Sequence, residues 1–335
     1  MKVPPPEKTK VVICTFLQFT FLRTPPEFAQ RVQARWPEMR VVHLPHYKLL
    51  PPELPDTDIF VGYLLRPEQF RSAVRLKWIH STAAGVAQLL YPEIRNSEIV
   101  LTNASGVHAD PMAEHIVGMM ISMARNFPLA MRHQLSRQWA QQEIWDGPPR
   151  PRELAGALAV FVGFGAVGRA TAARLRGLGV RVWAVTFSGI ADPALAERSF
   201  PPSELNTAVA AADFLIIAAP DTPETHHMIG PAQLAAMKSG AFLINVARGS
   251  LVDEPALIAA LKRRAIAGAA LDVTSVEPLP PESPLWSLEN VLITPHVSGV
   301  SERVWDRQAD LLLDNLERWF DGQPLRNRVD MARGY

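Results

Sequence analysis

This sequence has little cysteine, little excess of either charge and few long apolar runs. Among its 335 residues only Cys14 is a cysteine, which excludes an internal disulfide framework and is typical of a reducing compartment. Lys and Arg together number 34 against 33 Asp and Glu, so the charge indicates neither a nucleic-acid partner nor an anionic membrane surface. The uncharged stretch from Leu154 to Gly168 is 15 residues long, too short to span a bilayer. The N-terminus MKVPPPEKTK lacks the apolar core of a signal peptide, so we expect a cytoplasmic protein with no membrane partner.

Short apolar runs alternate with helical spacing along nearly the whole chain. This rhythm predicts an α/β fold with largely parallel sheets, and the length suits two domains. The predicted strands of the first series are 11–16, 40–44, 58–63, 77–81 and 99–103. Those of the second series are 158–163, 181–185, 214–219, 241–246, 268–273 and 291–294. We therefore expect two doubly wound units, a flavodoxin-like one followed by a Rossmann one.

A helix is predicted where the two series meet, with Asp110 as its N-cap and Pro111 at its first position. Its apolar side, which we expect to be core, consists of Met112, Ile116, Met119, Met120 and Met123. The segment 139–152, rich in Trp, Gln and Pro, is predicted to be a loop. A final amphipathic helix follows residue 300, and we expect it to pack back on the first unit. This predicts a discontinuous substrate domain of 1–108 and 298–335 around an NAD(P)-binding domain of 109–297.

The stretch VGFGAVGRA carries the pattern GxGxxG directly after a predicted strand and at the start of a predicted helix. The first glycine allows a tight turn, the second lets the backbone approach a pyrophosphate, and the third lets the helix pack on the strand. The free N–H groups and the dipole of the helix N-terminus then favour phosphate. The residues expected to line this site are Gly163, Gly165, Ala166, Val167 and Gly168. The sequence thus predicts a dinucleotide site.

An acidic residue is missing from VWAVTFSG, residues 182–189, where such a fold usually reads the adenosine ribose. The position about 20 residues after the glycines is Thr186. A carboxylate there would bind the ribose 2′-hydroxyl and repel a 2′-phosphate, whereas Thr186 and Ser188 can donate to a phosphate. No arginine lies between Arg181 and Arg198 to bind that phosphate strongly. The sequence therefore favours NADP over NAD by a small margin and leaves NAD open.

Three polar residues follow predicted strands in the second half of the chain, namely Arg248, Glu277 and His296. Ligands of open α/β sheets bind beyond the carboxyl ends of the strands, so all three should face the cofactor crevice. A guanidinium can hold a carboxylate and polarise the neighbouring carbonyl, and a histidine can exchange the proton of an alcohol. A carboxylate on the other ring nitrogen orients the imidazole and favours its protonated form. Together the three residues predict hydride chemistry on a small 2-keto or 2-hydroxy acid.

These motifs, with STAAGVAQ, NASGVHADPMAEH and PDTPETHHMI, make the chain similar to the D-isomer-specific 2-hydroxyacid dehydrogenase family over nearly its full length. The resemblance implies catalysis by Arg248, Glu277 and His296, with His296 as the acid/base. It implies that the backbone at Ala84, Gly85 and Val86 binds the substrate carboxylate opposite Arg248, and that Asp272 holds the nicotinamide amide. Further cofactor contacts are expected at Pro220, Thr225, Val246, Ala247, Arg248, His296 and Gly299. The resemblance also implies a homodimer through the coenzyme domain and favours a glyoxylate/hydroxypyruvate-type reductase.

Two other interpretations fit the sequence less well. A dinucleotide-sensing protein of the corepressor type shares the fold, but it should carry a disordered tail or a peptide groove, and we expect no tail here. A metal site would need His43 with His46, or His226 with His227, and both pairs lack partner Cys or carboxylate spacing. Because we expect adjacent side chains to point apart, we predict no metal. Fine substrate preference is expected to depend on loops such as 17–23, so glyoxylate, hydroxypyruvate and phenylpyruvate all stay open.

Overall fold

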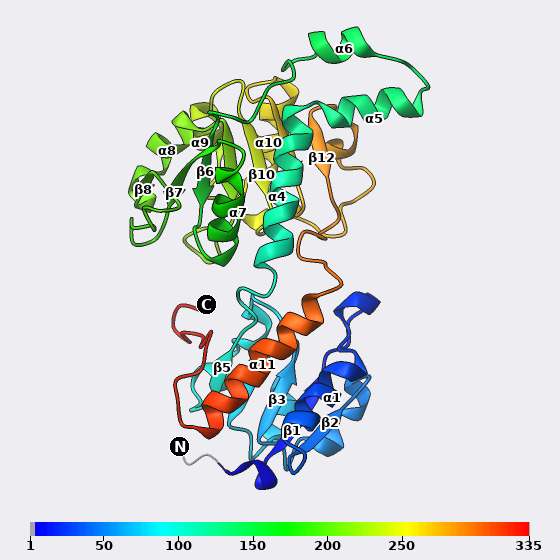
Figure 1. Ribbon diagram of the computed structural model, residues 1–335, viewed down its shortest axis with the longest axis vertical. Coiled ribbons are helices and arrows are strands. Elements are labelled where there is room, and N and C mark those ends of the chain that lie inside the picture. The colour runs from blue at the N-terminus through cyan, green and yellow to red at the C-terminus, as the bar shows by residue number, and fades with distance from the viewer. Residues whose placement is uncertain (1–3, 335) are drawn as a thin grey trace. The chain divides into compact units, whose positions relative to one another are not determined.

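The computed structural model describes residues 4–334, and the chain separates into two compact units. Unit 1 comprises 1–108 and 300–335, and unit 2 comprises 109–299. Each unit has one parallel sheet with helices on both faces (Figure 1). The predicted α/β fold class with two doubly wound units is therefore confirmed. In the described part of the chain, no helix is long and apolar enough to cross a membrane.

Unit 1 has a five-stranded sheet in the order β2-β1-β3-β4-β5. Its strands are β1 (Lys10–Cys14), β2 (Arg40–His43), β3 (Ile59–Gly62), β4 (Trp78–Ser81) and β5 (Val100–Thr102). Its helices are α1 (Pro26–Arg35), α2 (Pro67–Ser72), α3 (Pro92–Arg95) and α11 (Val304–Phe320). The strands β1, β3 and β4 are buried on both faces, which explains their nearly continuous apolar sequence.

The last helix, α11, packs on the same face of this sheet as α1 (Figure 1). Ala309, Leu312, Leu316 and Trp319 of α11 are buried there against Val11, Ile13 and Trp78 of the sheet. The spacing of these residues places them on one side of the helix, which is why the helix can cover the sheet. Gln308, on the turn before Leu312, donates to the Thr82 carbonyl at 2.6 Å and so fixes α11 to the segment after β4.

Unit 2 has a seven-stranded parallel sheet in the order β12-β11-β10-β9-β6-β7-β8. Its strands are β6 (Leu158–Val162), β7 (Arg181–Val185), β8 (Arg198–Phe200), β9 (Phe214–Ile217), β10 (Phe242–Asn245), β11 (Gly268–Leu271) and β12 (Val291–Ile293). Six of these were predicted, but the edge strand β8 was missed. With three residues, one of them Arg198, it has neither the length nor the apolar run that identifies a strand.

The helices of unit 2 are α4 (Ala109–Ala124), α5 (Phe127–Leu135), α6 (Gln141–Asp146), α7 (Ala166–Arg176), α8 (Leu205–Ala211), α9 (Pro231–Ala236) and α10 (Glu254–Lys262). The predicted apolar side of α4 is core, since Ile116, Met119, Met120 and Met123 are buried and Met112 packs against them. The predicted N-cap is wrong. The helix already begins at Ala109, so Asp110 lies in its first turn, where its carboxylate accepts from Arg174 of α7 at 2.9 Å.

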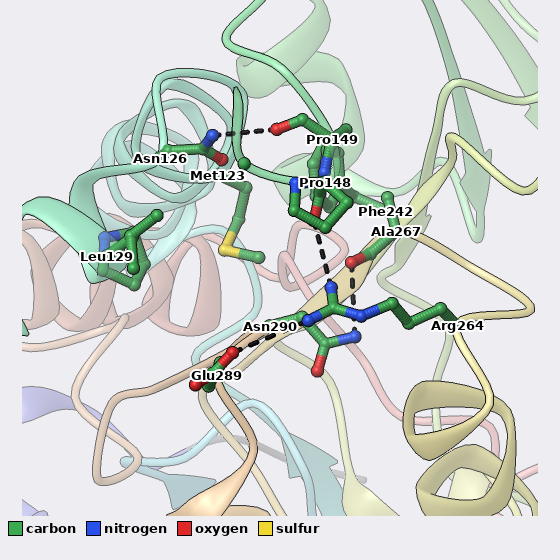
Figure 2. A pocket seen from close by; sticks show the side chains of 12 residues that line it. Met123, Asn126, Leu129, Pro148, Pro149, Phe242, Arg264, Ala267, Glu289 and Asn290 are labelled. Carbon is green, nitrogen blue, oxygen red and sulfur yellow. Dashed lines mark hydrogen bonds and ion pairs between the residues drawn. The ribbon is translucent and has the colours of Figure 1, made fainter. Parts of the chain in front are cut away.

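The arm, defined here as residues 127–147, contains α5 and α6 and joins α4 to β6 (Figure 1). The prediction of a plain loop over 139–152 is wrong for α6, whose six residues form a helix with no buried side chain. The base of the arm lines a partly open cavity of about 60 Å³ (Figure 2). There the Asn126 amide donates to the Pro149 carbonyl at 2.8 Å and Arg264 donates to the Pro148 carbonyl at 3.0 Å. Beyond this base the arm keeps large apolar side chains exposed, above all Leu135 at 86% and Trp139 at 94%.

Candidate active site

The predicted site residues of unit 2 follow the ends of six neighbouring strands, β12, β11, β10, β9, β6 and β7. Because all these strands are parallel, their carboxyl ends meet at one edge of the sheet. In order along that edge come His296, then Asp272 and Glu277, then Val246 to Arg248, then Pro220 and Thr225, then the glycine motif, and finally Thr186. Gly299 closes unit 2. The sheet thus gathers the three predicted catalytic residues at one end of an extended edge and Thr186 at the other.

The glycine motif has the local geometry that a dinucleotide requires. Gly163 has φ +87°, and a Cβ there would lie 2.5 Å from the Ala219 backbone. Gly165 precedes the first residue of α7 and is exposed, and a Cβ there would meet nothing within 4 Å. Gly168 is buried, and a Cβ would approach the Phe164 ring to 3.0 Å. The backbone at Gly165 is therefore open at the N-terminus of α7, and this loop fits a pyrophosphate.

Thr186 directly follows β7, and its hydroxyl group is already engaged. It donates to the Ile190 carbonyl at 3.1 Å, and the Ser188 hydroxyl lies 3.4 Å from the same oxygen. Ser188 is exposed and Thr186 is partly exposed, so these contacts can exchange with water or with a ligand. No carboxylate occupies the position after β7, in agreement with the sequence.

His296 and Glu277 form a short contact. The Nδ1 atom of His296 lies 2.6 Å from Oε2 of Glu277, and both side chains are at least one-third exposed. The other Glu277 oxygen accepts the Thr274 N–H at 3.2 Å, which fixes the carboxylate to the loop after β11. Because Nδ1 faces the carboxylate, Nε2 is the ring nitrogen left to exchange a proton with a substrate.

Asp272 follows β11 and is buried, and its carboxylate holds the loop that carries His296. It accepts the Val297 N–H at 2.9 Å, the Ser298 N–H at 3.0 Å and the Thr294 hydroxyl at 2.6 Å. Burial by itself would raise the pKa of the Asp272 carboxyl, but the hydrogen bonds from Ser298, Thr294 and Val297 outweigh it and hold that pKa below its usual value. Asp272 is therefore an anion bound by backbone and hydroxyl donors. The resemblance implies that Asp272 contacts the nicotinamide amide. Its role in holding the loop that carries His296 was not visible in the sequence.

Arg248 follows the turn after β10, and a residue that the sequence analysis missed positions this turn. Asn245, the last residue of β10, is buried. Its side-chain N–H donates to the Arg248 carbonyl at 2.9 Å, and its side-chain oxygen accepts the Ala247 N–H at 3.1 Å. Gly249 packs against the Thr274 backbone so closely that a Cβ would lie 2.0 Å from it. A buried asparagine at the end of an apolar strand needs hydrogen-bond partners, and this was the available signal.

The loop after β9 contains Pro220, which is exposed, and Thr225, whose hydroxyl donates to the Pro220 carbonyl at 2.8 Å. The expectation that His226 and His227 point apart is wrong, because their rings stack with centroids 4.0 Å apart. His227 has φ +49°, in the left-handed region, and this brings the two adjacent rings to the same side.

In unit 1, the predicted carboxylate-binding loop follows the carboxyl end of β4. Ala84 and Gly85 are exposed, whereas Val86 is buried in the core. Asn103 donates to the Ala84 carbonyl at 2.8 Å, and the Thr82 hydroxyl contacts that of Thr15 at 3.2 Å. The loop is thus fixed at its base and presents backbone to solvent at Ala84 and Gly85.

Comparison with known proteins agrees with these observations. The model of the D-isomer specific 2-hydroxyacid dehydrogenase NAD binding domain matches residues 117–298. A glyoxylate reductase of Thermofilum pendens is 35% identical over 254 residues, which cover 74% of this chain and 73% of that protein. A glyoxylate reductase of Korarchaeum cryptofilum is 32% identical over 294 residues, which cover 85% and 86%.

A solved structure adds the cofactor class. The D-isomer specific 2-hydroxyacid dehydrogenase of Xanthobacter autotrophicus Py2, in complex with NADPH and MES, has a TM-score of 0.82 and 28% identity. The match covers 98% of this chain and 99% of that one. These relatives are dehydrogenases and reductases, so a dinucleotide-sensing protein is not favoured. The chain belongs to the D-isomer-specific 2-hydroxyacid dehydrogenase family, and it is an NAD(P)-dependent oxidoreductase that acts on 2-keto and 2-hydroxy acids.

Proposed function

We propose that this protein reduces glyoxylate or hydroxypyruvate to the D-2-hydroxy acid, with His296, Glu277 and Arg248 as its catalytic residues. The observation that carries the proposal is the 2.6 Å contact between His296 and Glu277 at the sheet edge that also holds the glycine motif. Two curated relatives with about one-third identity over most of the chain are glyoxylate reductases, which supports this substrate class.

We assign the proton transfer to His296. Glu277 accepts from Nδ1 and orients the ring, so Nε2 can donate to the oxygen of the keto group as it becomes an alkoxide. NAD(P)H, when bound, supplies the hydride to C2. In the reverse direction the neutral imidazole takes the alcohol proton, and Glu277 stabilises the charge that then forms on the ring.

Arg248 is assigned the substrate carboxylate and the developing negative charge on the keto oxygen. Its guanidinium is exposed and planar, and bidentate binding of a carboxylate would fix the keto acid in one orientation. Asn245 keeps the turn before Arg248 in place through two hydrogen bonds, so the arginine starts from a fixed backbone. In unit 1, the backbone of Ala84, Gly85 and Val86 is proposed to bind a substrate carboxylate.

The cofactor is proposed to lie along the carboxyl edge of the unit 2 sheet, and unit 2 is accordingly the coenzyme domain and unit 1 the substrate domain. Its pyrophosphate would lie on Gly165 to Gly168, its adenosine ribose near Thr186, and its nicotinamide near Val246 to Arg248, Asp272 and Gly299. Pro220 and Thr225 lie between these ends of the edge. We propose a preference for NADPH, supported by the lack of a carboxylate after β7, although Thr186 and Ser188 must give up their contacts with Ile190 to donate to a 2′-phosphate.

We also propose a homodimer formed through unit 2, in which the arm is the contact surface. Its exposed apolar side chains, Phe127, Met131, Leu135, Trp139 and Trp145, are 48–94% exposed in the single chain. Aromatic residues exposed to this degree on one segment are typical of an interface. The double substitution Leu135→Ser and Trp139→Ser should yield monomers in sedimentation velocity, whereas a wild-type protein that already sediments as a monomer would contradict the dimer.

We propose a cytoplasmic location because Cys14 is the single cysteine of the sequence. Cys14 is buried, and burial raises the pKa of its thiol to about 12, so it is protected from oxidation as a reduced structural residue.

Initial rates with NADPH and NADH against glyoxylate, hydroxypyruvate and phenylpyruvate test the proposal. We expect turnover of glyoxylate or hydroxypyruvate, with the larger kcat/KM for NADPH. A clear preference for NADH would overturn the cofactor assignment alone. Tight dinucleotide binding without turnover of any of the three keto acids would overturn the reductase assignment.

A further inference from the structure

His296, which the proposed function makes the proton donor, has a backbone that the chain must hold in place. Its φ is +53°, in the left-handed region that residues with a Cβ rarely adopt. The strand before it, β12, is a three-residue edge strand and gives the loop little support of its own. The His296 N–H is fixed by the Asp272 carbonyl at 2.8 Å and the Thr294 carbonyl at 3.0 Å.

The next two N–H groups, of Val297 and Ser298, both donate to the Asp272 carboxylate. Successive backbone N–H groups that converge on one anion form a nest, and the anion stabilises the left-handed turn that creates it. The conformation of His296 therefore depends on where the Asp272 carboxylate lies. Since that side chain is completely buried, its position is set by its other partners.

Thr294 is the first of these partners, and its hydroxyl donates to Oδ1 of Asp272 at 2.6 Å. A hydroxyl has one hydrogen, so Thr294 can only accept in its 3.0 Å contact with Nε2 of His115. His115 consequently carries its proton on Nε2 and donates it. A directed chain of hydrogen bonds runs from His115 on α4 through Thr294 to Asp272, and from Asp272 to the backbone beside His296.

We propose that Thr294 and His115 are positioning residues for His296, which they orient through the Asp272 carboxylate. This inference rests on the proposed role of His296 as the proton donor. His115 stands in the second turn of α4, so the chain of hydrogen bonds also ties the start of unit 2 to the loop at its end. Without the Thr294 donor, Asp272 keeps the N–H groups of Val297 and Ser298 but loses the hydroxyl that also fixes Oδ1, and the His296 ring no longer keeps one orientation toward Glu277.

The test uses variants that remove or keep each donor. Thr294→Val removes the hydroxyl at nearly constant shape, and Thr294→Ser keeps it. His115→Leu removes the N–H donor, and His115→Gln keeps an amide N–H that can reach the same oxygen. For the full-length protein with saturating cofactor we would measure kcat, the KM of glyoxylate and the thermal unfolding midpoint of each variant.

We expect Thr294→Val and His115→Leu each to lower kcat by about tenfold, the equivalent of one hydrogen bond to a charged group, with the KM of glyoxylate unchanged within about twofold. Thr294→Ser and His115→Gln should restore most of kcat. Because the two donors act in one chain, the double variant Thr294→Val with His115→Leu should be little worse than either single variant. A merely structural role would lower the unfolding midpoint without this split between kcat and KM.

Two results would overturn the inference. One is wild-type kcat in Thr294→Val, and the other is a kcat in Thr294→Ser as low as in Thr294→Val. Both leave the proposed function intact, because that function is tested separately by wild-type turnover of the three keto acids and by the activity of His296→Ala.

Discussion

The buried imidazole of His80 makes the stability of unit 1 sensitive to acid. His80 lies on β4 and is fully buried, its Nδ1 is 2.8 Å from the Thr102 hydroxyl, and its Nε2 has no hydrogen-bond partner in the described chain. Burial lowers the pKa of His80 from 6.5 to about 4, because the charged ring would lose its hydration in the core. The folded state therefore excludes a proton that the unfolded chain binds.

The sign and size of the effect follow from this difference. Above the unfolded pKa of 6.5, neither state is protonated and His80 has no pH-dependent effect. As the pH falls from 6.5 toward 4, only the unfolded state gains the proton, so stability is lost through that window. The loss amounts to about 2 kcal/mol at about pH 5 and to about 3 kcal/mol below about pH 4.

Urea unfolding followed by tryptophan fluorescence measures this loss, because the ring of Trp78 lies with its centroid 6.1 Å from that of His80. The free energy of unfolding at about pH 7.5 and about pH 5 would be compared between wild type and His80→Gln, which cannot be protonated. His133→Gln serves as a control, since His133 is only partly buried on α5 in unit 2. We expect the wild type and the control to lose about 2 kcal/mol more than His80→Gln. An equal pH dependence in all three proteins would refute the reasoning.

Three further predictions concern the proposed site. Gly163→Ala should lower the free energy of unfolding by about 2–4 kcal/mol because its Cβ would meet the Ala219 backbone, whereas Gly165→Ala should leave unfolding unchanged and weaken dinucleotide binding in a titration. Asn245→Leu should raise the KM of glyoxylate by about tenfold through a displaced Arg248, and an unchanged KM would count against this support. Thr186→Asp should lower kcat/KM for NADPH by at least about tenfold relative to NADH, and an unchanged ratio would remove Thr186 from cofactor selection.

Much of the fold was predictable because its signals are local. The apolar runs of β6, β9 and β10 and the one-sided spacing of α4 and α11 each lie within a few consecutive residues. The edge strand β8 and the helix α6 were missed because neither buries an apolar stripe, and burial is what creates the pattern.

The candidate site was predictable where chemistry demands particular residue types. GxGxxG between a strand and a helix, and Arg248, Glu277 and His296 after strands, follow from what phosphate and hydride chemistry need. Thr294 was not found, because its hydrogen bond joins it to a residue 22 positions away, and their distance depends on the sheet. Asn245 contacts residues only two and three positions away, and its place at the end of an apolar strand was the signal that was overlooked. The contact of His115 with Thr294 spans 179 positions of the sequence, so no local pattern indicates it.

His296 as the proton donor is the central claim, and single-turnover hydride transfer from NADPH to glyoxylate tests it most directly. His296→Ala should bind NADPH as the wild type does, yet transfer hydride at least about 100-fold more slowly at every pH tested. Glu277→Gln, which keeps a neutral side chain beside Nδ1, should lie between the two proteins. Hydride transfer in His296→Ala at close to the wild-type rate would contradict the account.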